Sequence, residues 1–214
     1  MKRIIPYLTV LLGILLNACW PYKEDKNLLD QESKDYCLFG ERSYWIYQDS
    51  VTSVIDSLII EHSVEYQYIT VSEEYNFHRT WEEYRTRISS YSIDSTYNFW
   101  AILSSENGGS SFRSSFADYH NGSFGETSMG VCALIKKINS ITIDDNTFKD
   151  VKIFELNYYV YRPQYKRYKE IYYWAKHIGL IRKEKYEDND DYIYNLISIH
   201  NLIRYNIKPY NDNK

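Results

Sequence analysis

The sequence predicts a mainly β fold: a curved antiparallel meander sheet, either a half-barrel or a barrel, with one or two short helices. The chain has 214 residues and 24 tyrosines, and Tyr, Ile, Ser, Thr and Val dominate it, which favours strands. Short alternating segments also follow one another between turn residues. Neighbours in sequence usually pair, and roughly ten strands in one domain must curl, close or split into two sheets.

The first half of the chain is predicted to contain short strands. Alternation is clearest in residues 83–89 and 95–103, where apolar or aromatic side chains occupy every second position. The strands expected in this half are residues 43–48, 57–61, 64–71, 83–89, 95–103 and 112–116.

The second half has longer strand segments and one sharp connection. Lys176-His177-Ile178-Gly179 predicts a tight turn in which Gly179 takes a positive φ. The strands expected here are residues 141–143, 151–161, 171–175, 180–186 and 192–206. Helices are expected at residues 28–36, 77–84 and 131–138, although none has strong capping residues.

The N-terminus has the pattern of a secretory signal peptide. A basic start precedes an apolar run over residues 4–16, which is too short to span a bilayer because spanning needs roughly 20 residues. The run ends at Leu16-Asn17-Ala18-Cys19, which looks like a lipobox. The alternative is an ordinary signal peptide cut nearby, but a cysteine directly after a small residue favours lipidation of Cys19 with palmitate-type acyl chains.

This leader defines the expected domain boundaries and location. We expect a signal peptide at residues 1–18, a lipidated N-terminus and tether at residues 19–35, and a single β-rich domain at residues 36–210. The expected membrane partner is the outer membrane, with the domain on its periplasmic face or on the cell surface. Lys23-Glu24-Asp25 resembles the export signal of Bacteroidota surface lipoproteins, although a solvated charge cluster fits these residues equally well.

Cys37 and Cys132 are the cysteines that remain once Cys19 is lipidated. An oxidising compartment permits a disulfide between them, which the loop-entropy argument values at about 4–5 kcal/mol. Two buried thiols are the equally weighted alternative.

Charge and motifs exclude several functions. The chain has 25 basic and 29 acidic residues, and its basic clusters alternate with acidic or apolar residues, so we expect no nucleic-acid partner. We find no hydrolase, kinase, nucleotide-binding or paired-cysteine motif, and the five histidines are scattered. We therefore expect no enzyme activity, no metal site and no cofactor.

Two segments resemble a known class of proteins. Residues 171–184, which read IYYWAKHIGLIRKE, are similar to a hairpin of small uncharacterised Bacteroidota lipoproteins, and Leu202-Ile203-Arg204-Tyr205-Asn206 is similar to their last strand. With residues 44–47 and 56–58, the likeness touches most of the mature chain. Periplasmic half-barrels that carry lipids or lipoproteins share this tyrosine–hairpin–glycine style, so the resemblance implies such a fold by analogy.

Three tripeptides also match the O-glycosylation pattern of that bacterial group. They would place sugars on Ser50, Ser57 and Ser95, each of which follows an aspartate. Ser57 could equally lie in a paired strand, out of reach of a glycosylating enzyme.

Aromatic residues suggest a binding surface. Tyr159, Tyr161, Tyr173 and Trp174 lie in a crowded hairpin region, and aromatic faces stack on sugars and line lipid or peptide grooves. Adjacent strand residues point to opposite faces, so plain sheet packing is the competing interpretation. We expect a non-catalytic ligand-binding or carrier domain with a lipid, glycan or protein partner, and as the alternative a structural subunit of an envelope complex.

Overall fold

The computed structural model describes residues 23–62, 65–73, 77–92, 96–105, 110–113, 119–121, 125–126, 130–160, 166–188 and 193–210. The predicted signal peptide and the predicted positions Cys19, Ser95 and Tyr161 lie outside these residues. No helix in the described ranges is both long and apolar enough to cross a membrane.

The chain forms two compact units, residues 1–26 with 70–80, and residues 27–69 with 81–214. Three strands contribute to the smaller unit: β1 (Lys23–Asn27), β4 (Glu65–Glu73) and β5 (Phe77–Tyr91), with both β1 and β4 pairing with β5.

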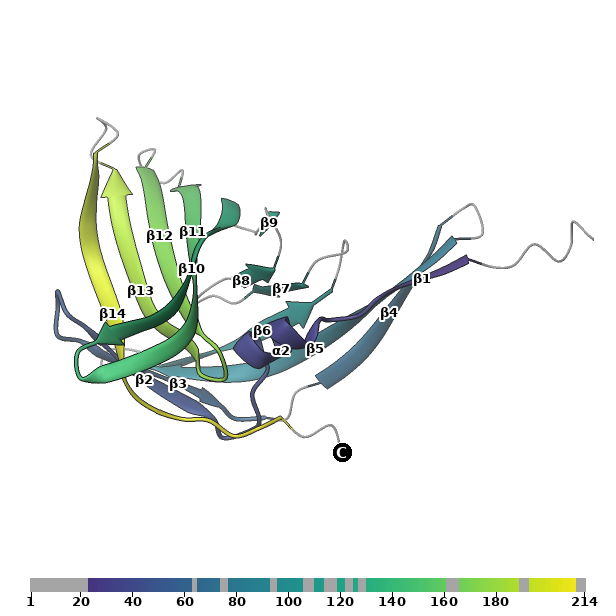
Figure 1. Cartoon of the computed structure of the whole chain (residues 1–214), viewed down its shortest axis with the longest axis horizontal. Helices are drawn as coiled ribbons and strands as arrows, with labels where there is room; N and C mark the ends of the chain where they lie inside the picture. Colours follow the sequence, from purple (N-terminus) through teal and green to yellow (C-terminus); the bar gives the residue numbers. More distant parts are fainter. Residues whose placement is uncertain are drawn as a thin grey trace, which may run out of the picture. The chain divides into compact units, whose positions relative to one another are not determined.

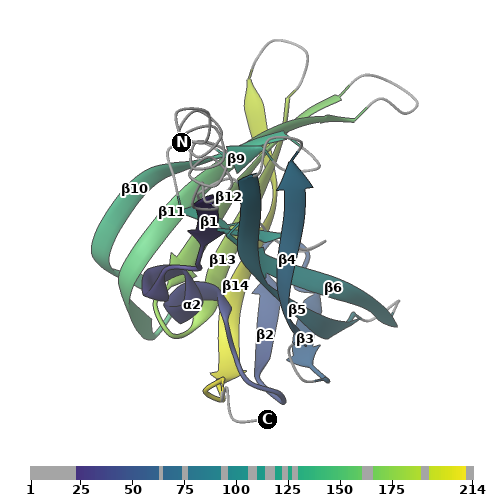
Figure 2. The ribbon, with the colours of Figure 1, turned by 90° about the vertical axis from the view of Figure 1, so that its right-hand side faces the viewer.

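The larger unit is a curved sheet of sequential antiparallel strands (Figures 1 and 2). Its order is β8-β7-β6-β5-β3-β2-β14-β13-β12-β11-β10-β9. The remaining strands are β2 (Tyr44–Asp49), β3 (Ile55–Ile60), β6 (Thr96–Ser104), β7 (Ser110–Arg113), β8 (Tyr119–Asn121), β9 (Gly125–Glu126), β10 (Gly130–Ile143), β11 (Asn146–Val160), β12 (Lys166–Ala175), β13 (Gly179–Asp188) and β14 (Tyr194–Asn206).

This topology confirms the predicted fold class. Two meanders, β2 to β8 and β9 to β14, are joined where the last strand pairs with β2, with Asn206 opposite Tyr44. No ladder among the described residues connects the two edge strands β8 and β9, so the sheet is open rather than a closed barrel.

The helix predictions were right once and wrong twice. The helix expected at residues 28–36 is α2 (Gln31–Cys37), but residues 77–84 belong to β5 and residues 131–138 to β10. The second error has a clear cause: β10 contains a bulge between Leu134 and Lys136 that interrupts its alternation. Short apolar runs are ambiguous between helix and strand. The pairing with β11 along the whole of β10 therefore decides that residues 131–138 form a strand.

Residues 29–35 belong to the folded domain rather than to the predicted tether. Leu29 and Ser33 are buried, and the curved sheet lies around α2, as the second view shows (Figure 2). The tether boundary at residue 35 was therefore too late, because the polar sequence conceals a helix that is fixed by contacts with distant strands.

The turn after β12 confirms the prediction for Gly179. Its φ is +95°, and a Cβ at this position would lie 3.1 Å from Cε2 of Phe39. The position therefore needs glycine both for its backbone conformation and for the close approach of an aromatic ring.

The two faces of β11 to β13 differ in what they bury. We call inner the face that carries Phe154, Leu156 and Tyr172, which are fully buried, and outer the face that carries Ile153 and Tyr173. Helix α2 packs on the inner side, where the ammonium of Lys152 lies 3.0 Å from a carboxylate oxygen of Glu32.

A buried carboxylate, Glu170, sits at the centre of the inner face. The hydroxyls of Tyr158 and Tyr172 donate to its two oxygens at 3.0 and 2.5 Å, and the Lys183 ammonium lies 3.1 Å away. Burial alone would raise the pKa of Glu170, but the charge of Lys183 and these hydrogen bonds outweigh it and hold the pKa below its ordinary value.

Because the pKa of Glu170 is lower in the folded chain than in the unfolded chain, its stabilising contribution is complete above the ordinary value of 4.5 and disappears as the pH falls through the folded pKa. We expect Glu170→Gln to lower the free energy of unfolding by about 3 kcal/mol at pH 7. The difference from the parent chain should shrink below pH 4.5, as measured by urea denaturation at several pH values. Glu155→Gln, on the outer face, is the control. A difference that stays constant down to pH 3 would contradict the assignment.

Candidate functional site

The larger unit contains a small apolar cavity inside the sheet. It is lined by side chains such as Trp45, Leu58, Phe112 and Trp174 and has a volume of about 50 Å³. Binding sites for small molecules have volumes of about 300–1,000 Å³, so this cavity is a packing defect rather than a ligand site.

A second hollow is large enough to hold a ligand. It is a groove of about 480 Å³ between helix α2, the turn after β12 and the chain that follows β14, and we call it the α2 groove. It is lined by Gln31, Lys34, Asp35, Leu38, Phe39, Tyr84, His177, Ile207, Lys208, Pro209 and Tyr210.

The chain after β14 forms one wall of this groove because its backbone is tied to the turn before β2. The Gly40 amide donates to the Lys208 carbonyl at 2.8 Å, and the Lys208 amide donates to the Ser43 hydroxyl at 2.9 Å. A Cβ on Gly40 would lie only 2.3 Å from the Pro209 carbonyl oxygen, so glycine is required there. The Tyr210 ring then meets the Tyr84 ring edge to face, with centroids 5.4 Å apart.

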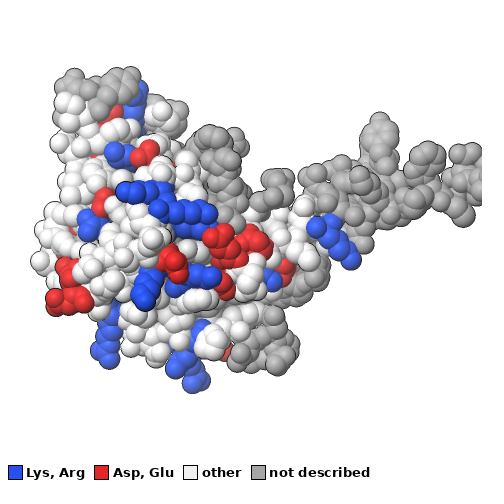
Figure 3. All heavy atoms as spheres, viewed as in Figure 1, with Lys and Arg blue, Asp and Glu red and all other residues white. Residues whose placement is uncertain are grey.

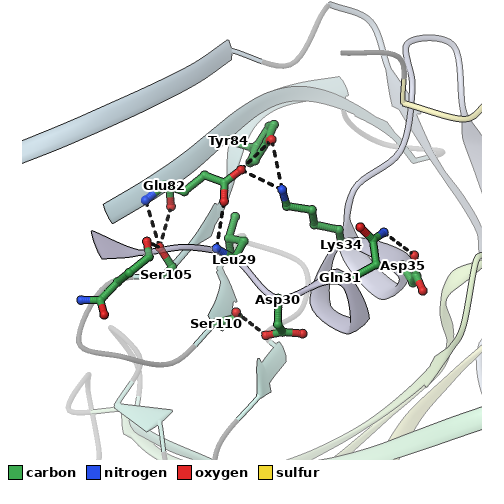
Figure 4. Close-up of polar contacts among 10 residues, drawn as sticks. Leu29, Asp30, Gln31, Lys34, Asp35, Glu82, Tyr84, Ser105 and Ser110 are labelled. Carbon is green, nitrogen blue, oxygen red and sulfur yellow. Dashed lines mark hydrogen bonds and ion pairs between the residues drawn. The ribbon is translucent and has the colours of Figure 1, made fainter. Parts of the chain in front are cut away.

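Helix α2 forms the opposite wall, and Asp30 caps its N-terminus. One carboxylate oxygen of Asp30 accepts the Ser33 amide at 2.7 Å, and the other accepts the Ser33 hydroxyl at 2.9 Å. The hydroxyl of Ser110 on β7 donates to Asp30 at 2.6 Å (Figure 4). The cap therefore also connects the helix to a strand 80 residues away in sequence.

Glu82 on β5 anchors helix α2 to the sheet. Its side chain is buried, and its two oxygens accept the Leu29 amide, the Lys34 ammonium and the Tyr84 hydroxyl, each at 2.8 Å (Figure 4). The ammonium of Lys34 also lies 5.3 Å from the centroid of the Tyr84 ring. A buried carboxylate with three donors is compensated for its lost hydration, and it fixes both the start and the middle of the helix.

Two further carboxylates of α2 form ion pairs with β11 and with the turn after β12. Glu32 pairs with Lys152, and Asp35 pairs with Lys176 at 3.2 Å. Burial would raise the pKa of Asp35, but its bonds to Gln31 and Lys176 lower it on balance. Figure 3 shows basic side chains gathered over the β10–β11 hairpin next to acidic side chains around α2.

The chemistry of the α2 groove is amphipathic. Leu38, Phe39, Ile207 and Pro209 give it apolar walls, and polar side chains stand at its rim. In the described ranges, no group of three or more His, Cys, Asp or Glu side chains could hold a metal ion. The groove has the volume of a small-molecule site, and among its described residues no nucleophile is paired with a base.

The predicted binding aromatics do not form one surface. Tyr159 is exposed on the outer face, and the Tyr173 hydroxyl on that same face donates to Glu184 at 3.1 Å. Trp174 lies on the inner face, buried in the core, where its ring meets Phe112 edge to face. The prediction of a shared aromatic surface was therefore wrong for the described residues, because Tyr173 and Trp174 are adjacent in a strand and must point to opposite faces.

The other predicted positions are also dispersed. Cys37 and Cys132 are both buried and are separate thiols in the structure rather than a disulfide. Ser50 is exposed in the turn after β2, and its hydroxyl accepts a hydrogen bond from Asn201 at 3.2 Å. Ser57 lies in β3 between β2 and β5, opposite Ile46 and Tyr91, so the paired-strand alternative describes it.

Sequence reasoning missed the residues that build the groove. Lys34, Glu82, Tyr84, Lys208 and Tyr210 come from segments far apart in the chain, and no spacing connects them. One usable signal was Asp30 followed three residues later by Ser33, where an aspartate precedes a helical segment. The others could be identified only from the topology that pairs β14 with β2.

Comparisons with known proteins give two similar structures. No protein-family model matches the chain, and no curated protein matches it. A presumed exported protein of Bacteroides fragilis with a YmcC-like fold has a TM-score of 0.47 and 8% identity, covering 80% of this chain and 98% of that chain. A presumed lipoprotein of Parabacteroides distasonis has a TM-score of 0.47 and 13% identity, covering 79% and 99%. Neither similarity assigns a function to this chain.

We expect Glu82→Gln to loosen α2 because the Lys34 ammonium loses its ionic partner. Stability should fall by about 1–3 kcal/mol, and hydrogen exchange measured by mass spectrometry should accelerate in residues 28–39 while residues 151–158 and 170–175 stay protected. The double variant Lys34→Met with Glu82→Gln should lose less free energy of unfolding than the two single variants lose together. Asp145→Asn, in the exposed turn after β10, is the control. Unchanged exchange in residues 28–39 would show that Glu82 does not anchor the helix.

Proposed function

We propose that this chain is a lipid-anchored protein of the cell envelope whose β domain binds a ligand, without catalysis, in the α2 groove. The observation that carries this proposal is the contrast between the two hollows described above. The groove has a volume of about 480 Å³ and the cavity inside the sheet about 50 Å³, and only the first lies in the range of ligand sites.

This proposal changes the expected place of binding. From the sequence, we expected a curved sheet to hold its ligand on an aromatic face. Trp174 on the inner face is buried in packing, and so are Trp45 and Tyr47 on β2. The described residues instead support a site on the surface. It is formed by helix α2, which precedes β2, and by the chain that follows β14.

A binding role without catalysis is consistent with the ionisable groups near the groove. Lys34 is paired with Glu82, and Asp35 is paired with Lys176. Burial raises the pKa of the Cys37 thiol well above its usual range, so this nearby cysteine stays protonated and unreactive at neutral pH.

The location is proposed from the leader. The signal-peptide pattern and the cysteine at position 19 support a lipid anchor in the outer membrane. The anchor is the membrane partner, and the domain would then lie at the periplasmic face or on the cell surface.

The second candidate function is a structural subunit of an envelope complex. Ile193, Leu196 and Ile197 expose 58%, 42% and 36% of their surface at the start of β14. This candidate rests on these three exposed side chains, because protein contacts use exposed apolar surface. This candidate places the contact at the start of β14 instead of at the α2 groove.

We expect the parent chain, expressed in a bacterial host, to incorporate radiolabelled palmitate and to fractionate with membranes. Cys19→Ala should abolish both, because it removes the thiol to which the lipid is attached. Cys37→Ala is the matched control and should keep the label, since this cysteine is buried in the domain. An unlabelled parent chain of full length would reject the anchor.

A fragment screen by NMR tests the binding role. With Cys19→Ala to prevent lipidation, fragments should shift the amide signals of Leu38, His177 and Lys208. Gln31→Trp should block these shifts by filling the groove, whereas Thr147→Trp, at the exposed hairpin tip, should not. Fragments that instead shift Leu196 and its neighbours would favour the structural-subunit candidate.

A further inference from the structure

We infer that the ligand of the α2 groove is a small amphiphile with an anionic head, held by Lys208 at the rim and by the apolar walls below. This inference rests on the proposed function and adds the chemical class of the ligand.

The lower part of the groove fits an apolar body. Leu38 and Phe39 follow directly after α2, while Ile207 and Pro209 face them from the chain after β14. Tyr84 is buried beneath the groove, with its ring edge to face against Tyr210, so these rings add to the apolar part of a surface that also carries polar atoms. Apolar surface of this kind gains about 25 cal/mol per Å² when a ligand removes it from water.

The rim favours a negative charge. The Lys34–Glu82 and Asp35–Lys176 pairs, with distances of 2.8 and 3.2 Å, each contribute no net charge. Lys208 is exposed, and no acidic side chain among the described residues lies within ion-pair distance of it. His177 is also exposed at the rim, where its backbone amide donates to the Asp35 carbonyl at 2.7 Å.

A purely polar or a cationic ligand fits this arrangement less well. Among the described residues that line the groove, Asp35 is the one carboxylate, and it is occupied by Gln31 and Lys176. Glu82 is buried beneath Lys34. A cation would therefore meet Lys208 without a partner of its own, and a sugar would leave the apolar walls unused. An anionic head on an apolar body matches both parts of the groove.

A matched pair of fluorescent probes tests this inference. 8-Anilinonaphthalene-1-sulfonate is anionic, and N-phenyl-1-naphthylamine has the same aromatic body without the charge. Both are titrated into the full chain carrying Cys19→Ala, and into the same chain with Lys208→Gln, Lys149→Gln or Gln31→Trp added. Lys149 is an exposed lysine on the hairpin and serves as the control for a general change of charge.

We expect the sulfonate to bind with one-to-one stoichiometry and about fivefold tighter than the neutral probe. Lys208→Gln should weaken the affinity for the sulfonate by about three- to fivefold, the effect of one exposed charge pair. The affinity for the neutral probe should not change. Lys149→Gln should change neither. Gln31→Trp should abolish binding of both probes at this site, and added salt should weaken only the sulfonate.

Two results would overturn the inference in different ways. Both probes could bind equally tightly, lose binding with Gln31→Trp and be unaffected by Lys208→Gln. In that case the groove binds ligands, but the anionic class is wrong. If neither probe responds to Gln31→Trp, or neither binds, the ligand class is rejected. In that case the fragment screen decides whether the proposed function fails with it.

Discussion

The α2 groove depends on one buried carboxylate. Helix α2 has seven residues, which is too short to be stable without tertiary contacts. Glu82 supplies them by accepting bonds from the Leu29 amide and the Lys34 ammonium. Because a buried charge is tolerated only when it is compensated, β5 and the N-terminal segment of the domain are bound to each other. Together with the Asp30–Ser110 hydrogen bond and the ion pairs of Glu32 and Asp35, this constraint fixes the wall of the groove formed by Leu38 and Phe39.

The opposite wall follows from the topology of the sheet. Pairing of β14 with β2 joins the two meanders and brings the chain after Asn206 to the turn at Gly40. The groove is thus a consequence of where both ends of the domain are attached: one end leads into α2 and the other forms the segment that contains Lys208. Such a site is built from the connections of a fold rather than from its central strands.

The sequence predicted the strands better than it predicted the groove. Alternation identified the sheet, and Gly179 in its turn was predicted correctly because its φ of +95° is a local property of the chain. The helix predicted at residues 131–138 was wrong because the bulge in β10 interrupts the alternation of side chains that marks a strand. Glu82 and Lys208 could not be recognised from the sequence, because the contacts that make them important are with distant segments. Leu29 and Lys34 lie 53 and 48 positions away from Glu82, and Ser43 lies 165 positions away from Lys208.

The richness in tyrosine has a structural explanation in strands β11 to β13. Glu170 on the inner face accepts hydroxyl hydrogens from Tyr158 and Tyr172, and Glu184 on the outer face accepts them from Tyr173 and Tyr186. Each carboxylate also pairs with cations: Glu170 with Lys183 and Lys185, and Glu184 with Arg182. A phenol covers apolar neighbours with its ring while its hydroxyl compensates a buried charge, so these tyrosines let the strands bury carboxylates on both faces. Aromatic residues in such a sheet are therefore weak evidence for a ligand. The argument for binding rests on the groove, where apolar walls meet Lys208, which has no acidic partner among the described residues.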